Sequence, residues 1–310
     1  MPSRTDILRS MQLVMGDCPD ESRRVPLEPC IEDEFDDGDV VRRLVTFAVE
    51  PGDRNSAWLM IPKDRLDSKR PGPAMVCLHQ TTGIGKDEPA GLGGLPNLHY
   101  AAELTKRGHV TFTPDYPNFG QYKIDCYKMG YASTSMKGIW NHGLAVDLVA
   151  GLPEADANRI GVIGHSLGGH NALFAAAFDD RLKVAVSSCG FTAFAWNDDE
   201  GRGQPGDLSD WCHSGYMPRI KDVYHCRAEE MPWDFPDVLA SIAPRAVFIN
   251  GPKQDFMRYE GVVHSVNVTR PLYEDAGVPE RFESVHPDCK HDFPPNVREQ
   301  AYAFVDRILR

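Results

Sequence analysis

The stretch RIGVIGHSLGGHNALFAAA, residues 159–177, decides the fold of this chain. It holds an apolar run, then Ser166 between flanking glycines, then a run of small residues that favour a helix. A buried strand, a tight turn and a helix in this order predict a nucleophile elbow. We expect Gly164 and Gly168 to be required, because a Cβ at either position would collide with the neighbouring strand or helix. The turn therefore predicts a nucleophilic Ser166 at a helix N-terminus, where backbone N–H groups favour a developing oxyanion.

Apolar runs alternate with helical patterns on both sides of this turn. The expected strands of the sheet are residues 74–78, 110–113, 160–163, 184–186, 246–249 and 281–285. The expected helices are residues 98–107, 135–150, 167–178, 263–275 and 296–309. Short apolar strands separated by helices predict a mostly parallel central sheet with helices on both faces. Before them, residues 40–49 and 56–61 flank turn residues and predict an N-terminal antiparallel hairpin, so we expect one α/β domain over residues 1–310.

Two segments do not follow this alternation of strands and helices. Residues 1–39 are expected to be a lead-in, and its acidic part, residues 32–39, to be a solvated segment rather than a calcium loop, since the ligand alternation of an EF-hand is missing. Residues 191–235 carry no clear strand but many aromatic residues, which argue against disorder. We predict a lid-like insertion that walls a pocket at the carboxyl edge of the sheet. The alternative is a surface excursion with its own aromatic core.

Composition excludes several classes of partner. The chain has 310 residues and a net charge of −12, without a lysine- or arginine-rich run, so we expect no nucleic-acid binding. No apolar run approaches the roughly 18 residues of a membrane span, and the first 30 residues show no secretion signal. We therefore expect a cytoplasmic protein with eight reduced cysteines, a small-molecule substrate, and scope for a homo-oligomer through residues 1–35 or the insertion.

A serine hydroxyl needs a base, and the base needs an orienting acid, which follow the serine in the chain order serine, acid, histidine. Asp255 lies in the loop after the strand at 246–249 and is the predicted acid. Rival carboxylates are those of Asp288, Asp292, Asp234 and Asp237.

The base is expected after the last strand. His291 stands just before the final helix and is the predicted base. His286 is the rival, but it follows the strand so closely that its reach is short, and Pro287 stiffens it. His165 adjoins the serine and is expected to be a packing residue, since a sequence neighbour cannot easily approach the serine hydroxyl edge-on.

The oxyanion formed in such a reaction needs two N–H donors. We expect one from Leu167 and one from the loop after the first parallel strand, where Gln80 and Thr81 are both candidates. The insertion contributes Trp196, Trp211 and Trp233, which we predict to be substrate-binding residues of an apolar or sugar-stacking pocket.

Metal and cofactor sites are not expected. Two clusters suggest zinc at first sight, and the first joins Cys212 and His213 to His225 and Cys226. The second cluster consists of His286, Cys289 and His291. Neither has the paired C-x-x-C spacing of a structural zinc site.

These motifs together resemble the α/β-hydrolase superfamily over about residues 40–310. The segments that carry the resemblance are LHQ at 78–80, PDY at 114–116, GHSLGG at 164–169, PRAVFING at 244–251 and HDF at 291–293. Within the superfamily they are similar to the dienelactone hydrolase-like and acetyl xylan esterase-like branches. The resemblance implies the α/β-hydrolase fold and a metal-free serine esterase with Ser166, Asp255 and His291 as its triad.

The chain also departs from its relatives. Dienelactone hydrolases proper have a cysteine where this chain has Ser166, and many relatives have His-Gly where it has His79-Gln80. Glucuronoyl esterases resemble this arrangement too, but they carry an arginine where this chain has Leu167. The predicted function is hydrolysis of carboxylic esters through an acyl-enzyme. The alternatives are a serine exopeptidase of the prolyl oligopeptidase type, a lactone or thioester hydrolase, and an inactive hydrolase fold that binds a ligand or partner.

Overall fold

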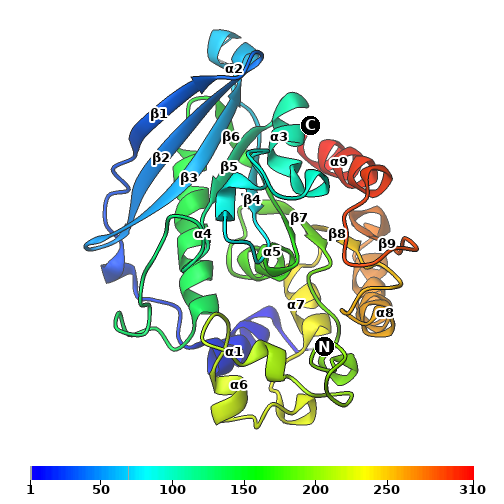
Figure 1. Ribbon diagram of the computed structural model, residues 1–310. Helices are drawn as coiled ribbons and strands as arrows, with labels where there is room; N and C mark the ends of the chain where they lie inside the picture. Colours follow the sequence, from blue (N-terminus) through cyan, green and yellow to red (C-terminus); the bar gives the residue numbers. More distant parts are fainter. Residues whose placement is uncertain (1, 69) are drawn as a thin grey trace.

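A single nine-stranded sheet runs through the computed structural model, which describes residues 2–68 and 70–310 (Figure 1). The strands are β1 (Cys30–Asp36), β2 (Val40–Glu50), β3 (Asp53–Pro62), β4 (Gly72–Leu78), β5 (Val110–Pro114), β6 (Ala155–His165), β7 (Leu182–Ser188), β8 (Ala246–Asn250) and β9 (Phe282–Val285). Their order across the sheet is β1-β2-β3-β5-β4-β6-β7-β8-β9. The first four strands in this order pair antiparallel, and β5 through β9 pair parallel.

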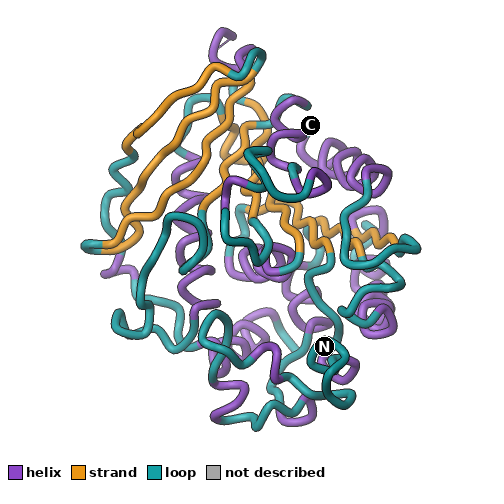
Figure 2. The backbone as a smooth tube through the Cα atoms, in the orientation of Figure 1, coloured by secondary structure: helices purple, strands orange, loops and turns teal. Residues whose placement is uncertain are grey.

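Helices cover both faces of the sheet (Figure 2). They are α1 (Arg4–Met15), α2 (Lys63–Ser68), α3 (Tyr100–Lys106), α4 (Thr134–Ala150), α5 (Leu167–Phe178), α6 (Arg219–Asp222), α7 (Phe235–Ile242), α8 (Tyr259–Asp275) and α9 (Pro295–Leu309). The apolar side chains of α3 and α9 form one core with the sheet, and those of α1, α4, α5, α7 and α8 form a second core. Because both faces are covered, the parallel strands are buried along almost their whole length, as their apolar sequences predict.

The lead-in is more ordered than the sequence analysis predicts. It contains α1, whose Ile7, Met11 and Val14 are buried at the spacing of one helix face, and the edge strand β1. The acidic residues of β1 are exposed, as expected for residues 32–36. The helical spacing of α1 is visible in the sequence, whereas β1 could not be recognised because an exposed edge strand lacks apolar alternation.

The insertion has no strand of its own among the described residues and consists of turns, α6 and short 3₁₀ helices. Its aromatic rings pack onto α5 and the start of α7. Phe194, Trp211 and Trp233 contact one another or Phe235 at ring-centroid distances of 5.1–6.1 Å, and Phe174 of α5 joins the same cluster. This aromatic core orders the segment and fixes its position above the carboxyl ends of the strands.

A buried ion pair network ties the hairpin to α4. The ammonium of Lys137, fully buried in α4, lies 3.1 Å from Glu50 and 2.8 Å from Asp53, which flank the β2–β3 turn. The hydroxyls of Tyr131 and Tyr122 donate to the same two carboxylates at 2.6 and 2.7 Å. Buried charges need such partners, so the network fixes where the hairpin meets the parallel part of the sheet.

Candidate active site

Ser166 stands at the turn between β6 and α5 with a backbone φ of 53° and ψ of −118°. A left-handed φ is costly for a serine and is held here by close backbone packing. A Cβ on Gly164 would lie 2.2 Å from the carbonyl oxygen of Gly168, and a Cβ on Gly168 would lie 2.0 Å from that of Leu78. The two glycines are therefore required, as the sequence predicts, and they bring the elbow against the end of β4.

His291 and Asp255 meet at the same edge of the sheet, in the loops after β9 and β8. The Nδ1–H of His291 donates to Oδ1 of Asp255 at 2.8 Å, and the Asp255 side chain is only 1% exposed. The His291 ring stacks on Phe256 at 4.4 Å and meets the ring of His165 edge-on at 4.7 Å between centroids. The imidazole is thereby held beside the residue that precedes Ser166.

Each rival carboxylate has another partner in the structure. Asp288 accepts from Gln254, and Asp292 accepts from Asn97. Asp234 and Asp237 form the capping box of α7. Asp255 is thus the carboxylate that the structure brings to His291.

The two rival histidines are also engaged elsewhere. His286 donates from Nδ1 to the carbonyl of Gly251 at 2.8 Å. His165 is buried and hydrogen-bonded through Nδ1 to Ser188 at 2.9 Å. Burial, followed by the neighbouring His291, lowers the pKa of His165 well below its usual range, so its ring is uncharged at neutral pH. The Nδ1 atoms of both histidines are therefore engaged by partners other than Asp255, and the burial of His165 is consistent with the packing role predicted for it.

The loop after β4 is fixed by His79. Its Nδ1–H donates to the carbonyl of Gln80 at 2.6 Å, and its Nε2 accepts from the backbone N–H of Tyr116 at 2.9 Å. Burial lowers the pKa of His79, which matches a neutral ring that donates at one nitrogen and accepts at the other. This loop adjoins the elbow, so Gln80, Thr81 and Leu167 lie in one neighbourhood, and the choice between Gln80 and Thr81 as donor stays a prediction.

A pocket of about 390 Å³ borders Ser166 and Leu167. Of the three tryptophans expected to bind substrate, the structure brings Trp211 to its wall. Trp233 is buried in the aromatic cluster, and Trp196 packs against His264 at 4.5 Å. Trp233 and Trp196 therefore pack against other residues and do not line this pocket. In an irregular segment, tryptophans that lie close in sequence can point in different directions.

Several residues that line the pocket at Ser166 were not predicted from the sequence. His170 lies one helical turn after Ser166, and that spacing is the signal that could have identified it. Tyr216 and Phe256 also line the pocket, as do the charged residues Asp199, Glu200, Arg202 and Asp210. No sequence signal separates these charged residues from the many solvated charges of the insertion.

Among the described residues, one group of side chains lies close enough together to bind a metal ion. This group differs from both cysteine–histidine clusters considered from the sequence. It consists of His165, Cys189 and His291, with one ligand atom of each within 4.8 Å of the others. The Nδ1 atoms of both histidines already hydrogen-bond to Ser188 and Asp255. The group is therefore part of the hydrogen-bonded surroundings of His291.

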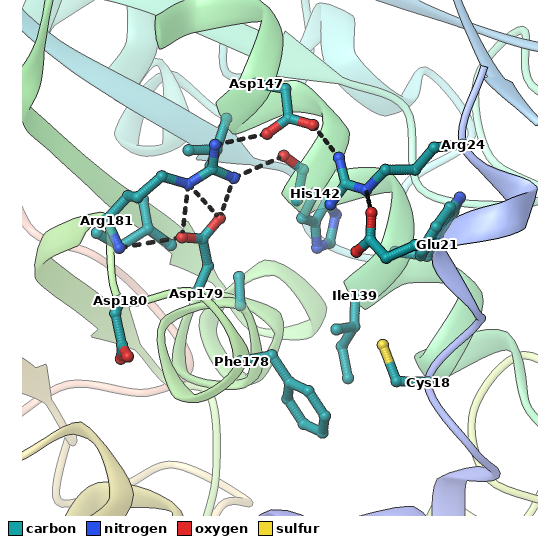
Figure 3. Close-up of a pocket in the computed structure, with 15 residues that line it drawn as sticks. Cys18, Glu21, Arg24, Ile139, His142, Asp147, Phe178, Asp179, Asp180 and Arg181 are labelled. Carbon is teal, nitrogen blue, oxygen red and sulfur yellow. Dashed lines mark hydrogen bonds and ion pairs between the residues drawn. The ribbon is translucent and has the colours of Figure 1, made fainter.

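A second pocket, of about 450 Å³, lies between the second half of α4, the end of α5 and residues 18–24 (Figure 3). It shares no lining residue with the pocket at Ser166. Arg24 and Arg181 reach Asp147 from opposite sides, and Arg181 also binds Asp179 (Figure 3). Because these charged side chains are paired with one another, we assign the reaction to the smaller pocket, which holds Ser166.

The parallel sheet, the strained serine elbow and the neighbouring histidine–carboxylate pair define an α/β-hydrolase. Residues 122–277 match the family described as "Glucuronyl esterase, fungi". The chain belongs to this glucuronyl esterase family. The matched segment includes Ser166 and Asp255 and ends before His291. The predicted resemblance to serine esterases is confirmed, and the matched family is that of the glucuronoyl esterases, which resemble this arrangement apart from the residue at Leu167.

Individual relatives match the chain over part of its length. The chain is 34% identical over 149 residues to the uncharacterized protein PA2218 of Pseudomonas aeruginosa, which covers 48% of this chain and 37% of that protein. It is 24% identical over 205 residues to the 4-O-methyl-glucuronoyl methylesterase of Hypocrea jecorina, covering 61% of this chain and 44% of that protein. The chain spans 37% to 64% of the length of the curated relatives it matches.

Solved structures show the same fold. A CE15 glucuronoyl esterase from Teredinibacter turnerae superposes with a TM-score of 0.73 at 18% identity, covering 98% of this chain and 83% of that chain. An acetyl xylan esterase from Paenibacillus sp. R4 superposes with a TM-score of 0.68 at 17% identity, covering 99% and 94%. Within the described residues, no helix is both long and apolar enough to cross a membrane.

Proposed function

We propose that this protein hydrolyses carboxylic esters through an acyl-enzyme, with Ser166 as nucleophile, His291 as base and Asp255 as the acid that orients it. His291 takes the proton of the Ser166 hydroxyl as the oxygen attacks the ester carbonyl carbon. The same imidazole then protonates the leaving alcohol. Water repeats the sequence on the acyl-serine and releases the carboxylic acid.

The observation that carries the proposal is the strained elbow next to an ordered His291–Asp255 pair. The 2.8 Å bond from Nδ1 leaves Nε2 as the nitrogen available to the serine, which is the tautomer that a general base requires. The backbone N–H groups of Leu167 and of Gln80 or Thr81 are the proposed oxyanion donors. Each such donor contributes about 3 kcal/mol in the transition state.

Membership in the glucuronyl esterase family supports hydrolysis of carboxylic esters over the alternative reactions considered from the sequence. Three relatives are named as 4-O-methyl-glucuronoyl methylesterases, which are carboxylic ester hydrolases. We therefore propose methyl esters of glucuronic acid and acetylated xylose as the first natural substrates to test. A cytoplasmic location and a homo-oligomeric state stay predictions.

The test is a stopped-flow burst of 4-nitrophenolate from 4-nitrophenyl butyrate, followed by labelling with a fluorophosphonate probe. We expect a burst equal to the enzyme concentration in the wild type, and neither burst nor label in Ser166→Ala. The matched control is Ser214→Ala, an exposed serine of the insertion, which should keep both. A labelled serine other than Ser166, or no turnover across ester, lactone and thioester panels, would overturn the proposal.

A further inference from the structure

The pocket at Ser166 has an excess of negative charge. Three carboxylates line it, those of Asp199, Glu200 and Asp210, whereas Arg202 is the one arginine or lysine on its described wall. His213 also lines the pocket, and burial lowers its pKa, so its ring is uncharged at neutral pH. With all three acids ionised, the wall carries a net charge of −2.

Arg202 cannot offset this excess, because two of the carboxylates already engage it. Its guanidinium donates to both oxygens of Asp199 at 2.9 and 3.1 Å and to Glu200 at 3.0 Å. The side chain that hydrogen-bonds Asp210 is the uncharged amide of Asn197, at 2.8 Å. A substrate that enters the pocket therefore meets a guanidinium that is already occupied and a carboxylate without a bonded cation.

Hydrolysis changes the charge of the acyl group at this position. An uncharged ester and water become an alcohol, a carboxylate and a proton, and the proton leaves through His291 to solvent. The new carboxylate forms at Ser166, inside the acidic pocket, where the like charges of the wall repel it. The repulsion is absent for the ester and present for its acid product.

Resting on the proposed esterase function, we propose that the Asp199, Glu200 and Asp210 wall restricts the enzyme to esters with an uncharged acyl group and drives the carboxylate product out of the pocket. These side chains act as specificity-determining residues and take no part in bond breaking. The inference excludes acyl groups that bear a second, free carboxylate.

The experiment compares two esters of the same acyl length, 4-nitrophenyl butyrate and the 4-nitrophenyl monoester of succinic acid. The wild type should prefer the uncharged ester in kcat/KM beyond the ratio of their spontaneous hydrolysis rates. Glu200→Gln and Asp210→Asn should each reduce this preference about fivefold, and the double variant about 25-fold, for unit charges acting across a partly solvated pocket. Butyrate should inhibit the variants at lower concentration than the wild type.

Asp222→Asn is the matched control. Asp222 is an exposed acid of the same insertion that does not line the pocket, so the variant changes the net charge equally and should leave the preference unchanged. Added salt should weaken the preference of the wild type, since exposed charges are screened. An unchanged ester ratio in the double variant, with the butyrate ester still turned over, would overturn this inference and leave the esterase proposal standing. Loss of turnover of both esters in the wild type would instead overturn the esterase proposal.

The preference should also depend on pH. Burial, with Asp199 and Glu200 adding to it, raises the pKa of Asp210 to about 6. The groups that face Asp210 are Asn197 as donor, the carboxylates Asp199 and Glu200, the Arg202 guanidinium and the Tyr216 hydroxyl. Asp210 becomes charged as the pH rises through that value, so the preference for the uncharged ester should increase from pH 5 to pH 7. Taking the ratio of the two esters at each pH cancels any pH dependence that the two reactions share. A flat ratio in the wild type, or the same rise in Asp210→Asn, would contradict the role of Asp210.

Discussion

Replacing Asp255 by asparagine isolates the charge of the proposed acid from its geometry. Oδ1 of Asp255 accepts from both His291 and the backbone N–H of Met257, at 2.8 and 3.1 Å. An asparagine can place its carbonyl oxygen at the same position and keep both bonds. Its amide nitrogen then takes the place of Oδ2, a buried oxygen without a hydrogen-bond partner among the described residues. We therefore expect the variant to retain the His291 tautomer and lose only the negative charge.

The size of the effect follows from the ion pair formed in the transition state. When His291 accepts the serine proton, its positive charge lies next to a carboxylate that is 1% exposed. Two unit charges about 4 Å apart interact by about 4 kcal/mol at an effective dielectric constant near 20. Each 1.36 kcal/mol changes a rate by about tenfold, so kcat should fall by about 10³-fold while KM changes little.

The assay is the rate of the burst phase with 4-nitrophenyl butyrate, which reports acylation directly. Asp288→Asn is the matched control, because this rival carboxylate binds Gln254 at the surface and should change the rate less than twofold. A decrease of less than tenfold in the burst rate of Asp255→Asn would refute the assignment of Asp255 as the acid of the triad. A large fall in Asp288→Asn would point to the rival.

Two further predictions concern stability and are measured by urea unfolding. Gly168→Ala should lower the free energy of unfolding by about 3 kcal/mol or more, because the new Cβ would lie 2.0 Å from a carbonyl oxygen of β4. The matched control is Gly143→Ala in α4, where a Cβ would meet no atom within 4 Å. This control should leave the free energy of unfolding unchanged or raise it by up to about 1 kcal/mol. Lys137→Met should lower the free energy of unfolding by about 3–5 kcal/mol because Asp53 keeps a buried charge without its cation, while Glu50 retains only the ion pair with Arg23 at 3.2 Å. Equal stability to the wild type would show that water reaches these carboxylates.

The sequence alone determined the framework of the site. Glycines around a serine, between an apolar strand and a helix, are a local pattern, and the strained turn it predicts is the one observed. The order of strands and helices followed from periodicity in the same way. Loops after neighbouring parallel strands open at one edge of a sheet, which is why Asp255 and His291 could be named as partners across 36 residues.

Only the tertiary structure decided which side chains share the pocket. The five candidate carboxylates are chemically equivalent in sequence, and their distances to His291 depend on how the start of α7 and the loops after β8 and β9 pack. Likewise Trp211 reaches the pocket while Trp233 fills the core, because an irregular segment has no period that fixes the direction of its side chains. The acidic wall beside Ser166 has the same origin, since residues 199–210 reach the elbow only when the aromatic cluster anchors the insertion to α5.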